Sequence, residues 1–202
     1  MARRRRPVLP AGAVLAPGAG AGSDHHALVF LDGVLQRHAI AVRRVDFPYR
    51  LAGRRAPDRP PVLVATVREA AQSLARDLGV EARRILLGGR SMGGRVCSLA
   101  ASEGLECAGL LLVSYPLHPP GAPGKLRTAH FGGIHVPCLF VSGERDRFGA
   151  PQEFDAALAA IASPVTRVVL AGGDHGLRAR DGEVGEALEA WLDGFAPGPA
   201  QD

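Results

Sequence analysis

The sequence has few cysteines and no long apolar run, and both absences limit what the protein can be. Only three of its 202 residues are cysteines: Cys97, Cys107 and Cys138. An odd number cannot pair completely, and each lies in a segment that reads as core, so we expect reduced thiols, as in a cytoplasm. No Cys/His spacing typical of a metal site occurs, and no apolar run approaches the roughly 20 residues of a membrane-spanning helix. We therefore expect no metal, no cofactor and no membrane partner.

Positive charge is scarce outside the N-terminus. The formal net charge is +4, and Arg3 to Arg6 alone account for it. A terminal block of like charge is usually a solvated tail, and no aromatic platform or helix-turn-helix pattern accompanies this one, so nucleic-acid binding is not favoured. The Arg run followed by residues 7–21 resembles a secretory signal, but Pro and Gly interrupt its apolar part, and cleavage would remove a strand and a loop that the fold needs.

The composition is that of a soluble globular domain, with 47% hydrophobic and 22% charged residues. The length fits one domain with a sizeable core. We predict a disordered Arg-rich tail over 1–10, a single domain over 11–196 and a short tail over 197–202.

Short apolar runs alternate with amphipathic helical segments along this domain, which is typical of an α/β fold around a mostly parallel sheet. Right-handed crossovers should make the strands parallel. Six strands are predicted, at 13–16, 40–46, 85–88, 109–114, 136–142 and 166–170. Five helices are predicted: one that begins after residue 23, one from residue 60 or 61 to 79, one over 92–103, one that begins at 151 and one over 182–195. The segments 47–61 and 115–135 are predicted to be irregular connections.

The run Gly89-Arg90-Ser91-Met92-Gly93 matches the G-x-S-x-G pattern, and it lies between a predicted buried strand and a predicted helix. In a nucleophile elbow the serine occupies a strained turn, and side chains two residues before and after it would clash. The helix that follows directs its N-terminal N–H groups toward the serine. We therefore predict Ser91 as a nucleophile.

A serine hydroxyl needs a base, and the base needs an acid to orient it. His175 follows the last predicted strand, where α/β sheets place their sites, and is the predicted base. Asp146 follows the preceding strand and is favoured as the acid over Glu144 on loop geometry. Asp174 is expected to be a turn residue.

The loop after the first predicted strand should supply half of an oxyanion hole. We predict the backbone amides of Ala19 and Met92 as its two donors. The alternative, a linker or a dinucleotide-binding loop, is less well supported because Gly18, Gly20 and Gly22 do not match G-x-G-x-x-G.

The chain resembles small α/β-hydrolases related to dienelactone hydrolase, specifically the family with testis-expressed-type and histone-acetyltransferase-complex-subunit-type hydrolase-like domains. The matching stretches are L-A-P-G-A-G-A-G-S-D-H-H from Leu15, D-F-P-Y-R from Asp46, G-G-R-S-M-G-G-R from Gly88, Y-P-L-H-P-P from Tyr115, G-E-R-D-R-F-G from Gly143 and G-D-H-G from Gly173. The resemblance implies a minimal α/β-hydrolase fold and the triad Ser91, Asp146 and His175. Family members often carry His where this chain has Pro17, so we expect a difference in that loop. Dienelactone hydrolase has a cysteine nucleophile, so its substrate is not carried over.

Together these patterns predict a serine hydrolase that acts on a small-molecule ester or related acyl substrate through an acyl-enzyme. The connection over 115–135 is too short for a full cap domain, so an open site is expected. Arg90 and His118 are possible substrate contacts, although an exposed loop position is the simpler expectation for His118. The simpler expectation for Arg90, Arg95 and Arg127 is that each forms a salt bridge or faces solvent; the alternative is that together they favour an anionic acyl group. Two alternatives stay open: a catalytically silent interaction module, and a serine peptidase or thioesterase.

Overall fold

The computed structural model describes residues 8–195. Arg3 to Arg6 and the predicted tail over 197–202 lie outside the described residues. Within the predicted N-terminal tail, residues 8–10 pack on the domain. The carbonyl of Leu9 accepts a hydrogen bond from Arg84, and Pro10 is buried.

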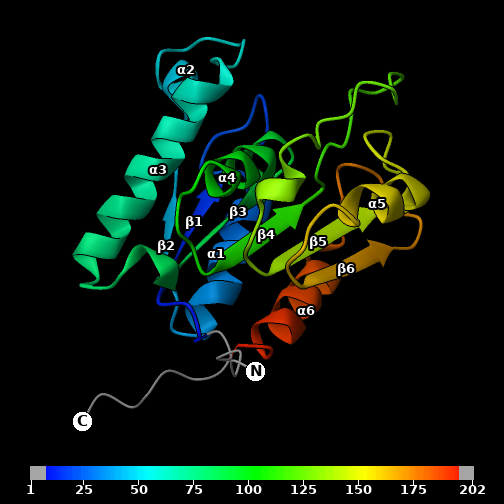
Figure 1. Ribbon diagram of the computed structural model, residues 1–202. Coiled ribbons are helices and arrows are strands. Elements are labelled where there is room, and N and C mark those ends of the chain that lie inside the picture. Colours follow the sequence, from blue (N-terminus) through cyan, green and yellow to red (C-terminus); the bar gives the residue numbers. More distant parts are fainter. Residues whose placement is uncertain (1–7, 196–202) are drawn as a thin grey trace.

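A single sheet of six strands organises the described part of the chain (Figure 1). The strands are β1 (Gly12–Ala16), β2 (Ala41–Arg44), β3 (Ile85–Arg90), β4 (Gly109–Val113), β5 (Cys138–Gly143) and β6 (Val165–Leu170). Their order is β2-β1-β3-β4-β5-β6, and every neighbouring pair is parallel. The predicted six-stranded parallel sheet is confirmed.

Within residues 8–195, six helices accompany the sheet: α1 (His26–Arg37), α2 (Pro48–Leu51), α3 (Pro60–Asp77), α4 (Met92–Ser102), α5 (Pro151–Leu158) and α6 (Asp181–Leu192). Proline begins α2, α3 and α5, where its missing N–H costs no helical hydrogen bond. The sequence did not predict α2, because four residues carry no helical period. It lies in the segment expected to be irregular.

The four central strands, β1, β3, β4 and β5, are buried on both faces because their side chains alternate between two apolar layers. Val14, Leu87 and Phe140 pack with α3, α4 and α5 in one layer, which also contains Cys97, Cys107 and Cys138. The adjacent Leu15, Leu86 and Val141 pack with α1 and α6 in the other layer. In Figure 1, α1 and α6 accordingly lie on the side of the sheet opposite α3 and α4. The sheet is therefore a rigid central layer.

All six strands end at the same edge of the sheet, so the loops that follow β1, β3, β5 and β6 meet there. The connection between β4 and β5 contains only the 3-10 turn Phe131–Gly133. No cap domain is therefore inserted between these strands, as predicted.

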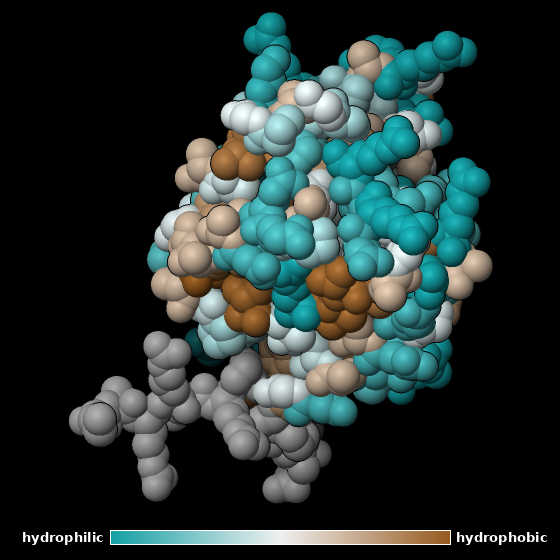
Figure 2. All heavy atoms as spheres, turned by 90° about the vertical axis from the view of Figure 1, so that its right-hand side faces the viewer, coloured by the Kyte–Doolittle hydropathy of each residue, from teal (hydrophilic) through white to brown (hydrophobic). Residues whose placement is uncertain are grey.

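On the face around β6, hydrophobic side chains lie in small separate groups among polar ones (Figure 2). None of the helices in the described part of the chain is long and apolar enough to cross a membrane.

Candidate active site

Ser91 lies in a sharp turn between β3 and α4. Its backbone has φ 52° and ψ −118°. This conformation is strained for any residue other than glycine, and such strain is common at functional sites. Its N–H donates to the carbonyl of Val113 on β4 at 2.9 Å, which holds the turn against the sheet. The hydroxyl is therefore presented at the C-terminal edge of the sheet, at the start of α4.

The two glycines of the G-x-S-x-G pattern allow β1 to pass close to this turn. A Cβ atom at Gly89 or at Gly93 would overlap the carbonyl oxygen of Ala16, the last residue of β1. Gly89 also has φ +154°. Only glycine satisfies both positions, and the contact places the loop after β1 beside the serine.

A chain of hydrogen bonds links Ser91, His175 and Asp146. The Nε2 atom of His175 lies 2.9 Å from Ser91 Oγ, and its Nδ1 atom lies 2.9 Å and 2.8 Å from the two carboxylate oxygens of Asp146. An ionised carboxylate only accepts, so Nδ1 carries the proton and Nε2 is free to accept one from Ser91. The structure thus brings together the three residues predicted from the sequence.

Close packing of the loops after β5 and β6 positions the acid and the histidine. A Cβ atom at Gly143 would overlap the backbone of Gly173, so the two loops lie in direct contact. Arg145 N–H donates to the Gly173 carbonyl at 2.8 Å. The side chain of Asp146 is fully buried, whereas that of His175 is 20% exposed. The histidine therefore has access to solvent while its partner does not.

Glu144 and Asp174, the other carboxylates of these loops, serve the backbone. Glu144 is exposed and accepts from the Gly172 N–H at 2.8 Å. Asp174 accepts from the N–H groups of Gly176 and Leu177, which makes it a turn residue. Neither bonds to the His175 ring.

Ala19 and Met92 both line a cavity of about 470 Å³ next to Ser91. Neither N–H donates to any acceptor within the described residues. Met92 begins α4, so its N–H lies at the positive end of the helix dipole. The two predicted donors are thus available to a negatively charged oxygen.

Residues of the D-F-P-Y-R stretch hold the loop that carries Ala19, which the sequence alone did not reveal. Asp46 accepts from both the N–H and the hydroxyl of Ser23, at 2.8 Å and 2.5 Å. The Gly20 N–H donates to the Tyr49 hydroxyl at 3.4 Å. Pro17, where the resemblance led us to expect a difference in the loop, is buried and its carbonyl oxygen lies next to Gly93.

Two further residues support His175. The ring of Phe148 stacks on the imidazole, with centroids 3.9 Å apart. Arg90 lines the cavity and donates from Nη2 to the His175 carbonyl at 2.7 Å. Burial lowers the pKa of the Arg90 guanidinium. Arg90, predicted as a possible substrate contact, therefore also fixes the loop that carries the histidine.

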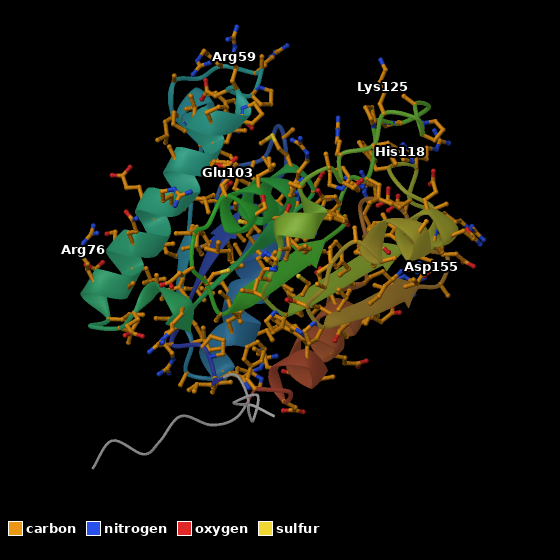
Figure 3. The ribbon with its side chains drawn as sticks, in the orientation of Figure 1. Arg59, Arg76, Glu103, His118, Lys125 and Asp155 are labelled. Atoms are coloured by element: carbon orange, nitrogen blue, oxygen red, sulfur yellow. The ribbon has the colours of Figure 1, made fainter. Side chains whose placement is uncertain are left out.

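In the structure His118 is neither at the substrate cavity nor exposed on a loop. It is buried and does not line the cavity. Its Nε2 atom lies 3.2 Å from Glu153, and its Nδ1 atom lies 2.8 Å from the Pro119 carbonyl, which raises the pKa of the ring. Figure 3 shows His118 on the connection after β4, which it ties to α5. Tertiary packing of that connection, which the sequence does not specify, explains the difference.

Within residues 8–195, no group of three or more His, Cys, Asp or Glu side chains is arranged to hold a metal ion. The chemistry available here is that of a polarised hydroxyl, a basic imidazole and two free amides.

A family model described as alpha/beta hydrolase domain matches residues 10–196. The chain belongs to the alpha/beta hydrolase domain family. This membership confirms the predicted fold.

Solved structures of similar fold agree with this alpha/beta hydrolase assignment. An alpha-beta serine hydrolase homologue from Coxiella burnetii is 20% identical, with a TM-score of 0.73 over 93% of this chain and 88% of that one. Dienelactone hydrolase from Anabaena variabilis is 16% identical, with a TM-score of 0.74 over 93% and 87%. Est1E from Butyrivibrio proteoclasticus is 15% identical, with a TM-score of 0.73 over 93% and 89%. At these identities the similarity is one of fold.

Proposed function

We propose that the protein is a serine hydrolase that cleaves an ester or related acyl substrate through an acyl-enzyme on Ser91. The observation that carries this proposal is the unbroken hydrogen-bond chain from Asp146 through His175 to Ser91 beside two free amides. Support also comes from membership of the alpha/beta hydrolase domain family. Within that family, the six sequence stretches described above favour the testis-expressed-type and histone-acetyltransferase-complex-subunit-type members.

In the first half-reaction Ser91 Oγ attacks the substrate carbonyl carbon while His175 Nε2 takes the hydroxyl proton. Asp146 stabilises the imidazolium that forms. The carbonyl oxygen becomes an oxyanion and accepts hydrogen bonds from the amides of Ala19 and Met92. Collapse of the tetrahedral intermediate breaks the bond to the leaving alcohol, which takes the proton from His175 and leaves the acyl group on Ser91.

In the second half-reaction water attacks the acyl-enzyme, and His175 again acts as the base. The proton then returns to Ser91 Oγ, and the carboxylic acid product is released. The solvent-exposed part of His175 provides a route for this water. The protein thus needs no cofactor for this reaction.

A fluorophosphonate probe tests the proposal, because its electrophilic phosphorus reacts covalently with the hydroxyl of an activated serine. We expect mass spectrometry of the labelled protein to locate the adduct on Ser91. Labelling should disappear in Ser91→Ala and persist in Ser73→Ala, a matched change on α3. Folded wild-type protein that does not label would favour the catalytically silent interaction module instead.

A substrate panel then separates the related acyl chemistries. Matched oxygen ester, thioester and peptide amide substrates would share one acyl-enzyme and differ in the leaving group. We expect the highest kcat/KM for the ester. A preference for the amide or the thioester would identify a peptidase or a thioesterase.

A further inference from the structure

Three guanidinium groups line the cavity beside Ser91, and they come from three different segments. Arg90 ends β3, Arg95 lies one turn into α4, and Arg127 belongs to the connection after β4. Arg90 already donates to the His175 carbonyl. Among residues 8–195, neither Arg95 nor Arg127 has a carboxylate within ion-pair distance. Two positive groups at the nucleophile are therefore not neutralised.

These two arginines are partly withdrawn from water and close enough to repel each other. The Nε atom of Arg95 is buried without a hydrogen-bond partner in the described part of the chain. Burial, and then the charge of Arg95, lowers the pKa of the Arg127 guanidinium. Desolvating two like charges costs free energy, and an anion bound between them would offset that cost.

The backbone around both arginines is well fixed. The N–H of Arg95 donates to the Ser91 carbonyl at 3.1 Å within α4. The carbonyl of Arg127 accepts from the Tyr115 hydroxyl at 2.9 Å, and its N–H donates to the Leu117 carbonyl at 2.7 Å. A site whose backbone is already ordered loses less entropy when a ligand binds.

One carboxylate, that of Asp58, lines the same cavity. Its Oδ1 atom pairs with Arg54 at 2.7 Å, and its Oδ2 atom is buried without a partner in the described residues. Asp58 is therefore already neutralised from outside the cavity, and the lining keeps a positive surplus. Figure 3 shows the neighbouring Arg59 on the segment that leads into α3 and Lys125 on the connection opposite, so further cations lie on both segments that flank the cavity.

We infer that the substrate is an ester that carries a carboxylate, which Arg95 and Arg127 bind while the ester carbonyl lies at Ser91. This inference rests on the proposed function. The planar guanidinium matches a carboxylate in a two-pronged hydrogen-bonded pair, so two arginines select for this group over a neutral one. A cavity of about 470 Å³ accommodates a small ester of this kind.

Matched ester pairs test the inference and locate the anion. One pair places it on the acyl side: the mono-p-nitrophenyl ester of glutarate against p-nitrophenyl valerate. The other places it on the alcohol side: 4-carboxyphenyl valerate against phenyl valerate. We expect kcat/KM to favour the anionic member of at least one pair by about tenfold or more, the range for hydrogen bonds to charged groups.

Arginine variants show whether these two residues cause the preference. In Arg95→Gln and Arg127→Gln the ratio of kcat/KM values should fall toward one, and Arg127→Lys should retain part of it. Arg76→Gln is the matched control, because Figure 3 shows Arg76 at the far end of α3 from Arg59. Its ratio should equal that of the wild type. If Arg95→Gln fails to fold, Arg127→Gln on the connection still provides the test.

The outcomes separate this inference from the proposed function. Labelling of Ser91 by the fluorophosphonate with equal turnover of both members of both pairs would overturn the carboxylate site alone. A preference that survives both glutamine variants would overturn it as well. Absence of labelling would overturn the proposed function, and the substrate assignment with it.

Discussion

Phe148 stacks on the imidazole of His175, with ring centroids 3.9 Å apart and planes inclined by 28°. The N–H of Phe148 donates to Asp146 Oδ1 at 2.8 Å. Phe148 therefore contacts His175 through its ring and Asp146 through its backbone. The stack restricts the imidazole to the plane in which both its nitrogens are hydrogen-bonded.

We predict that Phe148→Ala lowers kcat for a neutral ester by about tenfold, because the imidazole gains freedom to leave the reactive geometry. Phe148→Tyr keeps an aromatic ring that can stack on the imidazole. Its kcat should therefore stay within about twofold of the wild-type value. Steady-state kinetics on both variants checks this. Equal loss in the two variants would show that the stack is not what orients His175.

The second prediction compares the two carboxylates of the loop after β5. Asp146→Asn keeps the shape of the buried side chain but no longer holds the Nδ1 proton, so kcat should fall by several orders of magnitude, up to about 10⁴-fold. Glu144→Gln changes an exposed residue that bonds to the Gly172 amide, and it should change kcat by less than about twofold. Comparable losses in both variants would contradict the assignment of Asp146 as the acid.

Asp46 positions the loop that carries the Ala19 amide, and removing it should affect the reaction without touching substrate. Asp46→Ala deletes two hydrogen bonds from Ser23. We expect kcat to fall about tenfold while KM changes little, since an oxyanion donor acts mainly in the transition state. Asp77→Ala, which removes only the exposed ion pair with Arg43, is the control. A rise in KM at constant kcat would indicate a role in binding instead.

Much of the fold could be predicted from the sequence because glycine and proline punctuate its apolar runs. Pro60 and Gly79 frame α3 to within two residues, and Gly79 has φ +63°. Helix α2 was missed because its four residues follow no period. The second strand is shorter than predicted and ends at Arg44: the Val45 N–H still donates to Leu15 on β1, but Asp46 already bonds to Ser23 in the loop after β1.

For the candidate site, sequence patterns identified the residues that can be located from their position after a strand alone. Ser91 directly follows the buried strand β3, and His175 lies in the loop after β6, the last strand. Phe148 and Asp46 could not be identified, because their contacts join segments far apart in the chain and depend on how closely two loops pack. His118 illustrates the same limit: its distance from the cavity follows from its contact with Glu153, 35 residues later.

Gly93 offers a test of the close contact between β1 and α4. In Gly93→Ala the new Cβ would overlap the carbonyl oxygens of Ala16 and Pro17, so the free energy of unfolding should fall by about 1–3 kcal/mol or more. Gly33→Ala, in α1, meets no atom within 4 Å and should raise it by about 0.5–1 kcal/mol. Chemical denaturation measures both. Unchanged stability of Gly93→Ala would mean that β1 can move away from the turn at no cost.

The last prediction concerns pH and His130, whose Nε2 lies 2.8 Å from Ser98 Oγ. Burial, and then the charge of Arg95, lowers the pKa of His130 from 6.5 to about 4. Between these values the unfolded chain binds the proton and the folded chain does not. The contribution of His130 to stability is therefore complete above pH 6.5 and is lost as the pH falls through 4, by about 1–2 kcal/mol after allowance for solvent.

Carboxylates add their own acid dependence, so the test is a difference between proteins. Urea denaturation from pH 7.5 to 4.5 should give a flatter profile for His130→Gln than for the wild type, whereas His135→Gln, an exposed control, should follow the wild type. Parallel profiles for all three proteins would show that His130 is not buried in its neutral form.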